Sequence, residues 1–332
     1  MSKAAKVWLI VGAALVLAGC VVFCCVLSFL DWDFNNLSTE NYETKVYEFD
    51  GALGTIDGDI YIETDTADVE IVASRDMDIN TAKVVCYENI KEPHSVSISD
   101  GVLTVKYTDA RQLTDFIGVN NDSPKVTIYL PQGTWGRYGD LYVKTSTGDV
   151  AIPSGLTFDS IDVTSSTGDV DNSASVMGSL EIENNTGDIN MKNMMAFSIE
   201  LSTSTGDISL ENVDCHNELN IRVSTGKTKL KTVSCGTFIS KGTTGDIIMD
   251  ELKALLQMTI ERTSGDVEFR SCDSSSIRVF TDTGDVYGVF SNNVMFNVET
   301  DTGDVDVPEG IMDGPGGYIQ TNTGDVKIEI ED

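Results

Sequence analysis

The stretch LYVKTSTGDVAI, residues 141–152, contains the pattern that decides the fold. Apolar residues stand seven and five positions before Gly148 and two and four positions after it: Leu141, Val143, Val150 and Ile152. Apolar residues at every second position on both sides of a Thr-Gly-Asp corner predict a strand, a turn and a strand with one face directed inward. Glycine suits such a corner because it adopts positive φ values that a Cβ resists.

The corner recurs ten times, and its spacing predicts the architecture. Successive corner glycines are 20, 19, 19, 20, 19, 20, 19, 19 and 21 residues apart, and the fifth corner reads Thr225-Gly226-Lys227 instead of Thr-Gly-Asp. A fixed period of this length is typical of a solenoid, whose coils bury their apolar faces by stacking. We therefore predict an all-β protein, a single-stranded β-solenoid of about ten 19–20-residue coils over residues 141–332. At the ~4.8 Å spacing of paired strands, about ten coils form a rod of about 48 Å.

Residues 46–140 break the period and predict an N-terminal β cap. A degenerate copy places Ile60, Ile62, Val69 and Ile71 in the four apolar slots, around Thr66-Ala67-Asp68. Residues 96–105 resemble a hairpin on Asp100-Gly101, and residues 126–130 resemble a buried strand ended by Pro131. Such a cap would cover the first open edge of the solenoid. At the other end, the charges of Glu329, Glu331 and Asp332 are expected to blunt the last coil.

The N-terminal segment predicts a membrane anchor. Residues 7–30 contain no charged side chain, and as a helix they would span about 36 Å, enough for a bilayer core of about 30 Å. Lys3 and Lys6 precede the segment and no Lys or Arg follows until Lys45, which predicts a cytoplasmic stub at 1–6, a transmembrane helix at 7–30 and a juxtamembrane linker at 31–45. In the alternative, Leu17-Ala18-Gly19-Cys20 is a lipoprotein cleavage site and Cys20 carries the lipid. Both versions place the remaining chain outside the plasma membrane.

The charge balance excludes one class of partner. The chain has a formal net charge of −31, and all 53 acidic residues follow residue 30. Nucleic acid is excluded as a partner, because binding phosphates requires clustered Lys and Arg. A solvated acidic face is the simplest interpretation, although such a surface could attract divalent cations or basic partners.

The corner aspartates are the first candidate site. They are Asp149, Asp169, Asp188, Asp207, Asp246, Asp266, Asp285, Asp304 and Asp325. If the coils stack in register, these carboxylates lie near 5 Å apart and repel one another, so something must offset the repulsion. Hydrogen bonds from turn amides are one solution. Bound Ca²⁺ is the alternative, although one Asp per coil gives fewer oxygens than Ca²⁺ prefers.

A basic island is the second candidate site. Its members are Arg222, Lys227, Lys229, Lys231 and Lys241, around the corner at which Lys replaces Asp. Charge compensation between Asp207 and Asp246 is one explanation. A docking site for an anionic cell-wall polymer is the other.

The remaining reactive residues offer no catalytic pattern. Cys215 and Cys235 each stand nine positions after a corner glycine, so they should be neighbours on adjacent coils, either as two inward thiols or as a disulfide. Cys86 shows no His at metal spacing, and His94 is expected in a loop without a partner. The sequence contains no HExxH, P-loop, GxSxG or dinucleotide fingerprint. We therefore predict a protein without enzymatic activity or a required cofactor.

The N-terminal anchor, the Thr66-Ala67-Asp68-Val69 copy, the strand ending in Tyr129-Leu130-Pro131 and the tandem Thr-Gly-Asp repeats together resemble a known family. It is the bacterial membrane-anchored β-strand-repeat domain of unknown function, often labelled "putative adhesin". The resemblance covers nearly the whole chain. It implies a surface protein of Gram-positive-type bacteria, sometimes linked with envelope-stress systems, and it supplies no catalytic residues.

Two functions are consistent with these features. The rod is either an adhesin-like binding module for a cell-wall or surface polymer, or an envelope-stress accessory or sensor that acts through membrane proteins. A cytoplasmic stub of six residues is too short to signal alone, so the second function requires a partner in the bilayer.

Overall fold

The computed structural model describes residues 16–17, 19–21, 24, 28, 42–50, 58–77, 81–109, 123–132, 137–308 and 314–331. Most of the predicted anchor at 7–30 lies outside the described residues, and those described within it are helical. No described helix combines the length and apolar character that crossing a membrane requires.

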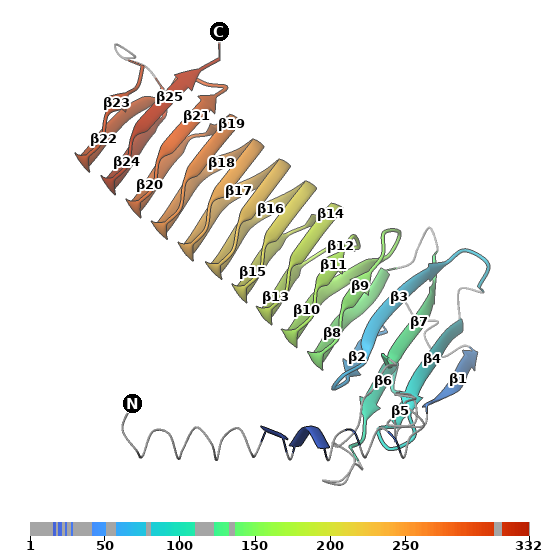
Figure 1. The fold of residues 1–332 in the computed structure, drawn as a ribbon. Helices are drawn as coiled ribbons and strands as arrows, with labels where there is room; N and C mark the ends of the chain where they lie inside the picture. Colours follow the sequence, from blue (N-terminus) through green and yellow to red (C-terminus); the bar gives the residue numbers. More distant parts are fainter. Residues whose placement is uncertain are drawn as a thin grey trace, which may run out of the picture.

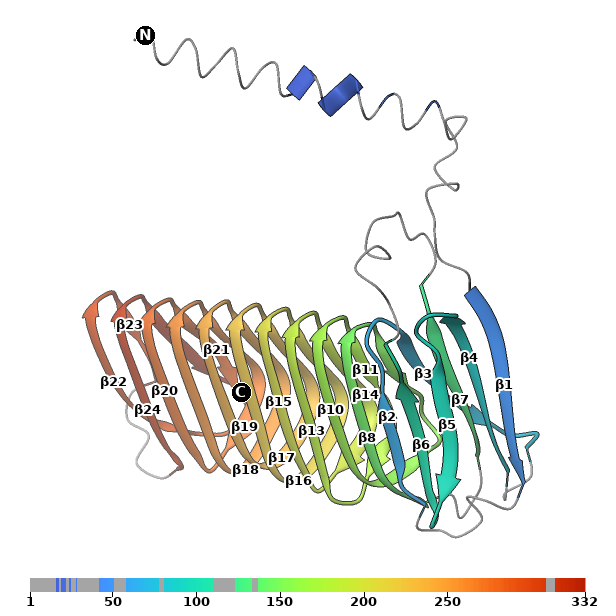
Figure 2. The ribbon, with the colours of Figure 1, turned by 90° about the horizontal axis from the view of Figure 1, so that it is seen from below.

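The described strands form one continuous sheet that winds into a rod with a broader N-terminal end (Figure 1, Figure 2). In chain order they are β1 Tyr42–Asp50, β2 Ile60–Glu63, β3 Asp68–Ser74, β4 Thr81–Asn89, β5 His94–Ser99, β6 Val102–Tyr107, β7 Lys125–Pro131, β8 Arg137–Thr147, β9 Val150–Ile152, β10 Thr157–Thr167, β11 Val170–Asn172, β12 Ser175–Val176, β13 Ser179–Thr186, β14 Ile189–Ala196, β15 Ser198–Thr205, β16 Ile208–Thr225, β17 Thr228–Thr244, β18 Ile247–Ser264, β19 Val267–Ser274, β20 Ser276–Thr283, β21 Val286–Phe290, β22 Met295–Thr302, β23 Val305–Asp306, β24 Gly316–Thr323 and β25 Val326–Ile330.

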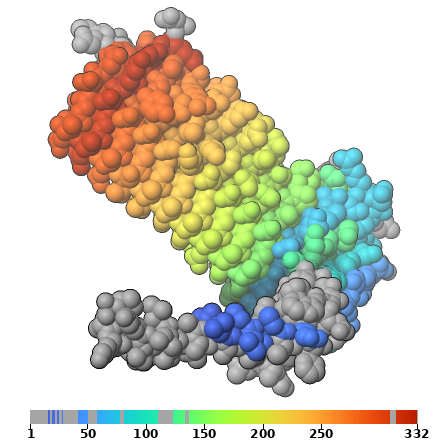
Figure 3. All heavy atoms as spheres, viewed as in Figure 1, coloured from blue at the N-terminus to red at the C-terminus, as the bar shows by residue number. Residues whose placement is uncertain are grey.

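Each coil pairs in parallel with the equivalent strands of the next coil. Leu219 of β16 faces Phe238 of β17, which in turn faces Met258 of β18, and all three are fully buried. The apolar slots predicted around each corner therefore align into one core along the rod. On the face shown in the space-filling view, the stacked coils make a continuous surface along the rod (Figure 3). The predicted all-β solenoid is confirmed.

The corners show why glycine recurs. All ten corner glycines have positive φ, between 125° and 154°. At Gly206, a Cβ would lie 2.0 Å from the carbonyl oxygen of Gly187, the corner glycine of the preceding coil. The corners therefore need glycine for two reasons, the backbone conformation and the close approach of neighbouring coils.

The N-terminal cap contains coils stacked out of chain order. β2 and β3, the degenerate copy, stack directly on β8 and β9, with Ile60 opposite Leu141 and Val69 opposite Val150. On their other side lie β6 and β7, which also run parallel to them. Beyond these strands, β4 pairs antiparallel with β7, β1 with β4 and β5 with β6. The hairpin predicted on Asp100-Gly101 is confirmed by the β5–β6 pair.

The C-terminal end shows a second exchange of order. β24 lies between β20 and β22, and β25 lies between β21 and β23 (Figure 1). The last coil of the chain is therefore the second from the end of the rod, and the expectation that Glu329 and Glu331 blunt the terminal coil is wrong. Asp332, the third residue of that expectation, lies outside the described residues. The physical difference is burial: Ile319 and Val326 of the inserted coil are fully buried, whereas Val305 of the outermost coil is 47% exposed.

Candidate functional site

The corner aspartates form a hydrogen-bonded ladder. In each rung, Oδ1 of one aspartate accepts the backbone N–H of the corner residue on the neighbouring coil, over 2.7–3.2 Å. The ladder begins at Asp68 in the cap and runs to the N–H of Lys227, whose side chain has no carboxylate to continue it. It resumes at Asp246 and ends with the N–H of Asp304 on Oδ1 of Asp325. The turn amides thus offset the carboxylate charge. Calcium binding along the ladder stays a prediction.

The basic island divides between the two sides of the corner, and each of its cations faces an acid on another coil. Lys227, Lys229 and Lys231 follow the corner glycine and pair with Asp246, Asp207 and Glu211 at 3.0, 3.4 and 3.6 Å. Before the corners, Arg222 pairs with Glu200, and Lys241 pairs with Glu261 at 2.9 Å. The hydrogen bond from Lys227 raises its own pKa and lowers that of Asp246. This geometry is what charge compensation requires.

A groove of about 710 Å³ runs along the rod beside the corners. It is lined by residues two to four positions before the corner glycine on five neighbouring coils. Arg222 and Lys241 belong to this lining, together with the polar side chains of Gln320 and Asn322. Two of the five cations of the basic island therefore border this groove.

Arg262 also lines the groove, although its side chain is only 5% exposed. It points inward, where its Nη2 donates to Thr228 Oγ1 at 3.2 Å and to Ser240 Oγ at 2.9 Å. Burial lowers the pKa of this guanidinium to about 10. No carboxylate of the described residues forms an ion pair with Arg262, so its charge is buried without a counter-ion among them. Such a charge is costly unless something neutralises it.

The repeat departs from its pattern around this side chain. Thr228 and Ser240 occupy slots that are apolar in most other coils, and both are fully buried. Gly242 leaves room for the guanidinium, because a Cβ there would lie 2.3 Å from Nη1 of Arg262. Sequence reasoning missed Arg262. The signal that could have located Arg262 was that Thr228, Ser240 and Gly242 all depart from the repeat pattern in a single coil.

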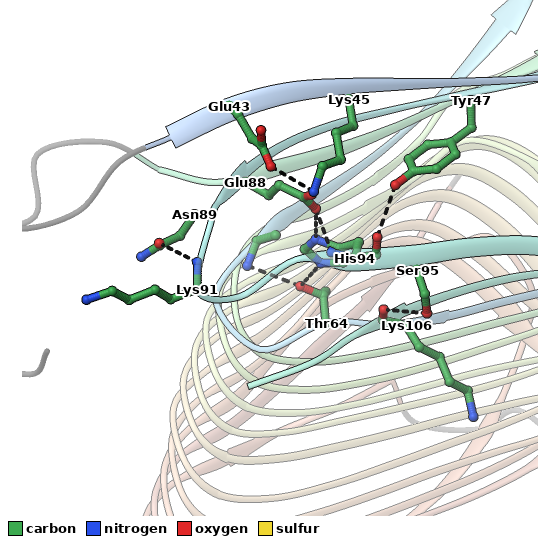
Figure 4. A network of polar contacts seen from close by, with 11 residues as sticks. Glu43, Lys45, Tyr47, Thr64, Glu88, Asn89, Lys91, His94, Ser95 and Lys106 are labelled. Atoms are coloured by element: carbon green, nitrogen blue, oxygen red, sulfur yellow. Dashed lines mark hydrogen bonds and ion pairs between the residues drawn. The ribbon is translucent and has the colours of Figure 1, made fainter. Parts of the chain in front are cut away.

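A second polar cluster, also missed, lies in the cap (Figure 4). His94 begins β5, and its Nδ1 lies 2.8 Å from Oε2 of the buried Glu88. Oε1 of Glu88 lies 2.8 Å from Nζ of Lys45, which also pairs with Glu43 at 2.7 Å. Burial lowers the pKa of His94, against the raising effect of Glu88. The expectation of a partnerless His94 in a loop is wrong, because residues 90–93 turn the chain back and bring His94 against β4.

The cysteines behave as two inward thiols. Cys215 and Cys235 occupy paired positions on β16 and β17, and both are buried and free. Burial raises the pKa of Cys215 to about 11 and that of Cys235 to about 12. Both are therefore inert, protonated side chains of the core.

Comparison with known proteins gives a family match. The model of the Toastrack DUF4097 family matches residues 58–217 and 213–332. No curated protein matches the chain.

Solved structures with a similar fold come from several bacteria. An adhesin described as putative from Parabacteroides distasonis is 13% identical, with coverage of 89% of this chain and 98% of that one and a TM-score of 0.42. One from Bacteroides fragilis is 14% identical, with coverage of 88% and 98% and a TM-score of 0.40. A chain from Parabacteroides distasonis described as a putative lipid binding protein is 14% identical, with coverage of 89% and 98% and a TM-score of 0.44.

Proposed function

We propose that this chain, which belongs to the Toastrack DUF4097 family, is an adhesin-like rod that binds an anionic surface polymer in the groove above Arg262. The proposed role is binding and not catalysis. Residues 7–30 would hold the rod at the outer face of the plasma membrane, with the N-terminus in the cytoplasm. The rod would then present its groove to the cell wall or to a neighbouring surface.

One observation supports the proposal most strongly. Arg262 is the one Lys or Arg side chain in the described chain that is buried, and it lies in the lining of a groove large enough for several sugar units. A phosphate or carboxylate group of a polymer could supply the missing counter-ion. Guanidinium binds both groups with paired, geometrically defined hydrogen bonds. Arg222 and Lys241 at the same groove would attract further negative charge.

The length of the groove suits a polymer better than a small molecule. Its lining comes from five stacked coils, so it extends along the rod axis across the strands. A chain of repeating units could follow this axis and leave one anionic group at Arg262. Phe280 offers an apolar surface at the same groove for the face of a sugar ring.

The test measures retention of three polymers by the purified full chain. A poly(glycerol phosphate) and a polygalacturonate are expected to bind, and neutral dextran is not. Arg262→Gln keeps a hydrogen-bonding side chain but removes the charge, and it should weaken binding of the anionic polymers about tenfold or more, the value of one charged hydrogen bond. Arg222→Glu with Lys241→Glu should abolish binding.

Lys327→Glu is the matched control. Lys327 is an exposed cation paired with Glu329 at 3.3 Å, and it lies outside the groove. This variant makes the same charge change as each single substitution of the double variant, and it should bind like the original chain. Binding of dextran as tight as that of the anionic polymers, or anionic binding unchanged in Arg262→Gln, would refute the proposal. Recovery of membrane proteins from detergent extracts without polymer binding would favour the envelope-stress role.

A further inference from the structure

Three metal-ligating side chains meet inside the cap, away from the groove. β4 buries alternate residues, so Cys86 and Glu88 lie on the same face of it, and His94 begins β5. Cys86 and Glu88 are fully buried, and His94 is 6% exposed. One ligand atom from each side chain lies within 4.8 Å of the other two. We propose that Cys86, Glu88 and His94 bind one divalent cation of the Zn²⁺ class, independently of polymer binding in the groove.

The donor set indicates the class of metal. A thiolate sulfur, an imidazole nitrogen and a carboxylate oxygen are the ligands of Zn²⁺ and similar ions, whereas Ca²⁺ and Mg²⁺ take oxygen ligands alone. Around tetrahedral Zn²⁺ the ligand atoms lie roughly 3.3–3.8 Å apart, given bond lengths of about 2.0–2.3 Å. The three ligand atoms already lie within 4.8 Å of one another, so shifts of about an ångström or less would close the site.

The surroundings supply the other parts of such a site. Thr64 Oγ1 lies 3.3 Å from Nε2 of His94 and would accept its N–H when Nδ1 binds the metal, as ligating histidines usually require. A cavity of about 10 Å³, enough for about one water, is lined by His94 and Asn89. Nδ2 of Asn89 is buried and, among the described residues, has no acceptor, so it could donate to a water there. Neither Cys86 nor Glu88 lines this cavity, so the water would lie at the His94 end of the cluster.

Protons and charge balance when the metal binds. The Cys86 thiol loses its proton to solvent as the metal–sulfur bond forms, and the Nδ1 proton of His94 moves to Nε2. Lys45 now neutralises Glu88, but it is 36% exposed and already lies 2.7 Å from Glu43. Lys45 can therefore stay with Glu43 when the cation replaces it. One dication, one thiolate and one carboxylate then leave no net charge in the buried site.

Cobalt binding tests the proposal with a signal that reports sulfur directly. The purified full chain is incubated with Co²⁺, passed through gel filtration, and its absorption spectrum recorded. We expect one Co²⁺ per chain with a thiolate-to-cobalt band in the near ultraviolet, and Zn²⁺ should displace it. Cys86→Ser should remove the band and weaken binding by more than the roughly 10–100-fold that loss of an outer partner costs.

Two further variants complete the test. Cys272→Ser removes another buried free thiol, in β19, and should leave the cobalt spectrum unchanged. Lys45→Met removes the ammonium that competes for Glu88, so it should bind Co²⁺ more tightly than the original chain. Circular dichroism confirms that each variant is folded. A chain that retains no Co²⁺, or a spectrum that is the same in Cys86→Ser, would overturn the proposal. Polymer binding should not change in Cys86→Ser, so the two proposals fail separately.

Discussion

Replacing one ladder aspartate by Asn or by Ala separates its hydrogen bond from its charge. Asp188 is the best position, because it lies between two regular rungs. Its N–H donates to Asp169 Oδ1 at 2.8 Å, and its own Oδ1 accepts the N–H of Asp207 at 2.7 Å. Asp188→Asn keeps the acceptor and removes the charge. Asp188→Ala removes both.

The hydrogen bond of Asp188 stabilises the fold, and the repulsion between its charge and the neighbouring aspartates destabilises it by a similar amount. One hydrogen bond contributes a net stability of about 0.5–1.5 kcal/mol. The same range applies to the hydrogen bond from Asp207 to Asp188, because the corner is exposed to solvent. Two like charges ~4.8 Å apart repel by about 0.9 kcal/mol in water, roughly halved by physiological salt, so two neighbours cost about 1 kcal/mol. The free energy of unfolding of Asp188→Ala should therefore be about 1 kcal/mol lower than that of Asp188→Asn. Asp188→Asn should be as stable as the original chain or slightly more stable.

Hydrogen exchange at the amide of Asp207 is the most local measurement. Its protection should fall about fivefold in Asp188→Ala, as expected for about 1 kcal/mol, and should be kept in Asp188→Asn. Urea denaturation gives the global value, and added salt should stabilise the original chain more than Asp188→Asn. Equal loss of protection in both variants would refute the hydrogen-bond interpretation. If millimolar Ca²⁺ raised the Tm of the original chain by many degrees and not that of Asp188→Asn, the ladder would instead be a calcium site.

Three further predictions concern the fold. Gly206→Ala should lower the free energy of unfolding by at least about 1–3 kcal/mol, the cost of positive-φ strain, because its Cβ would also clash with the Gly187 carbonyl. Gly316→Ala is the control: its Cβ would meet no atom within 4 Å, so the same urea titration should give a nearly unchanged free energy of unfolding. Because burial lowers the pKa of His94 below its ordinary value of 6.5, the folded state favours neutral imidazole, so the free energy of unfolding should fall as the pH drops below about 6.5. His94→Gln should remove this component of the pH dependence, which denaturation between pH 7.5 and 5 would reveal. Removing residues 314–332 should expose the amides of β22 to rapid hydrogen exchange while those of β18 stay protected, since β22 pairs with β24; a β22 that stays protected would contradict this stacking order.

The repeat makes most of the rod predictable from sequence. The apolar slots around Gly148 and its equivalents give the strands, their inward face and their parallel register, because each coil can bury that face only against its neighbours. The copy at Ile60–Ile71 was predictable for the same reason. Its place beside β8 was not, because residues 75–136 intervene and only tertiary packing decides which coil lies next to it.

The order of the last coils could not be predicted. The coils around Gly303 and Gly324 carry the same pattern, and nothing local indicates that the second lies inside the first. The candidate sites show a similar limit. The ladder follows from the period, but the burial of Arg262 depends on gaps left by Thr228, Ser240 and Gly242. Cys86, Glu88 and His94 come together only because residues 90–93, between β4 and β5, turn the chain back.

The exchanged order at the C-terminal end has a consequence for biosynthesis. A stack of this kind grows as each newly made coil settles on the preceding one, but β22 and β23 leave the ribosome before the strands on which they rest. β22 and β23 cannot make their observed pairings until β24 and β25 have been made and have stacked on β20 and β21. The rod is therefore completed in a single late event that adds two layers together, and a nascent chain halted near residue 308 would present an unfinished template to every other nascent copy nearby.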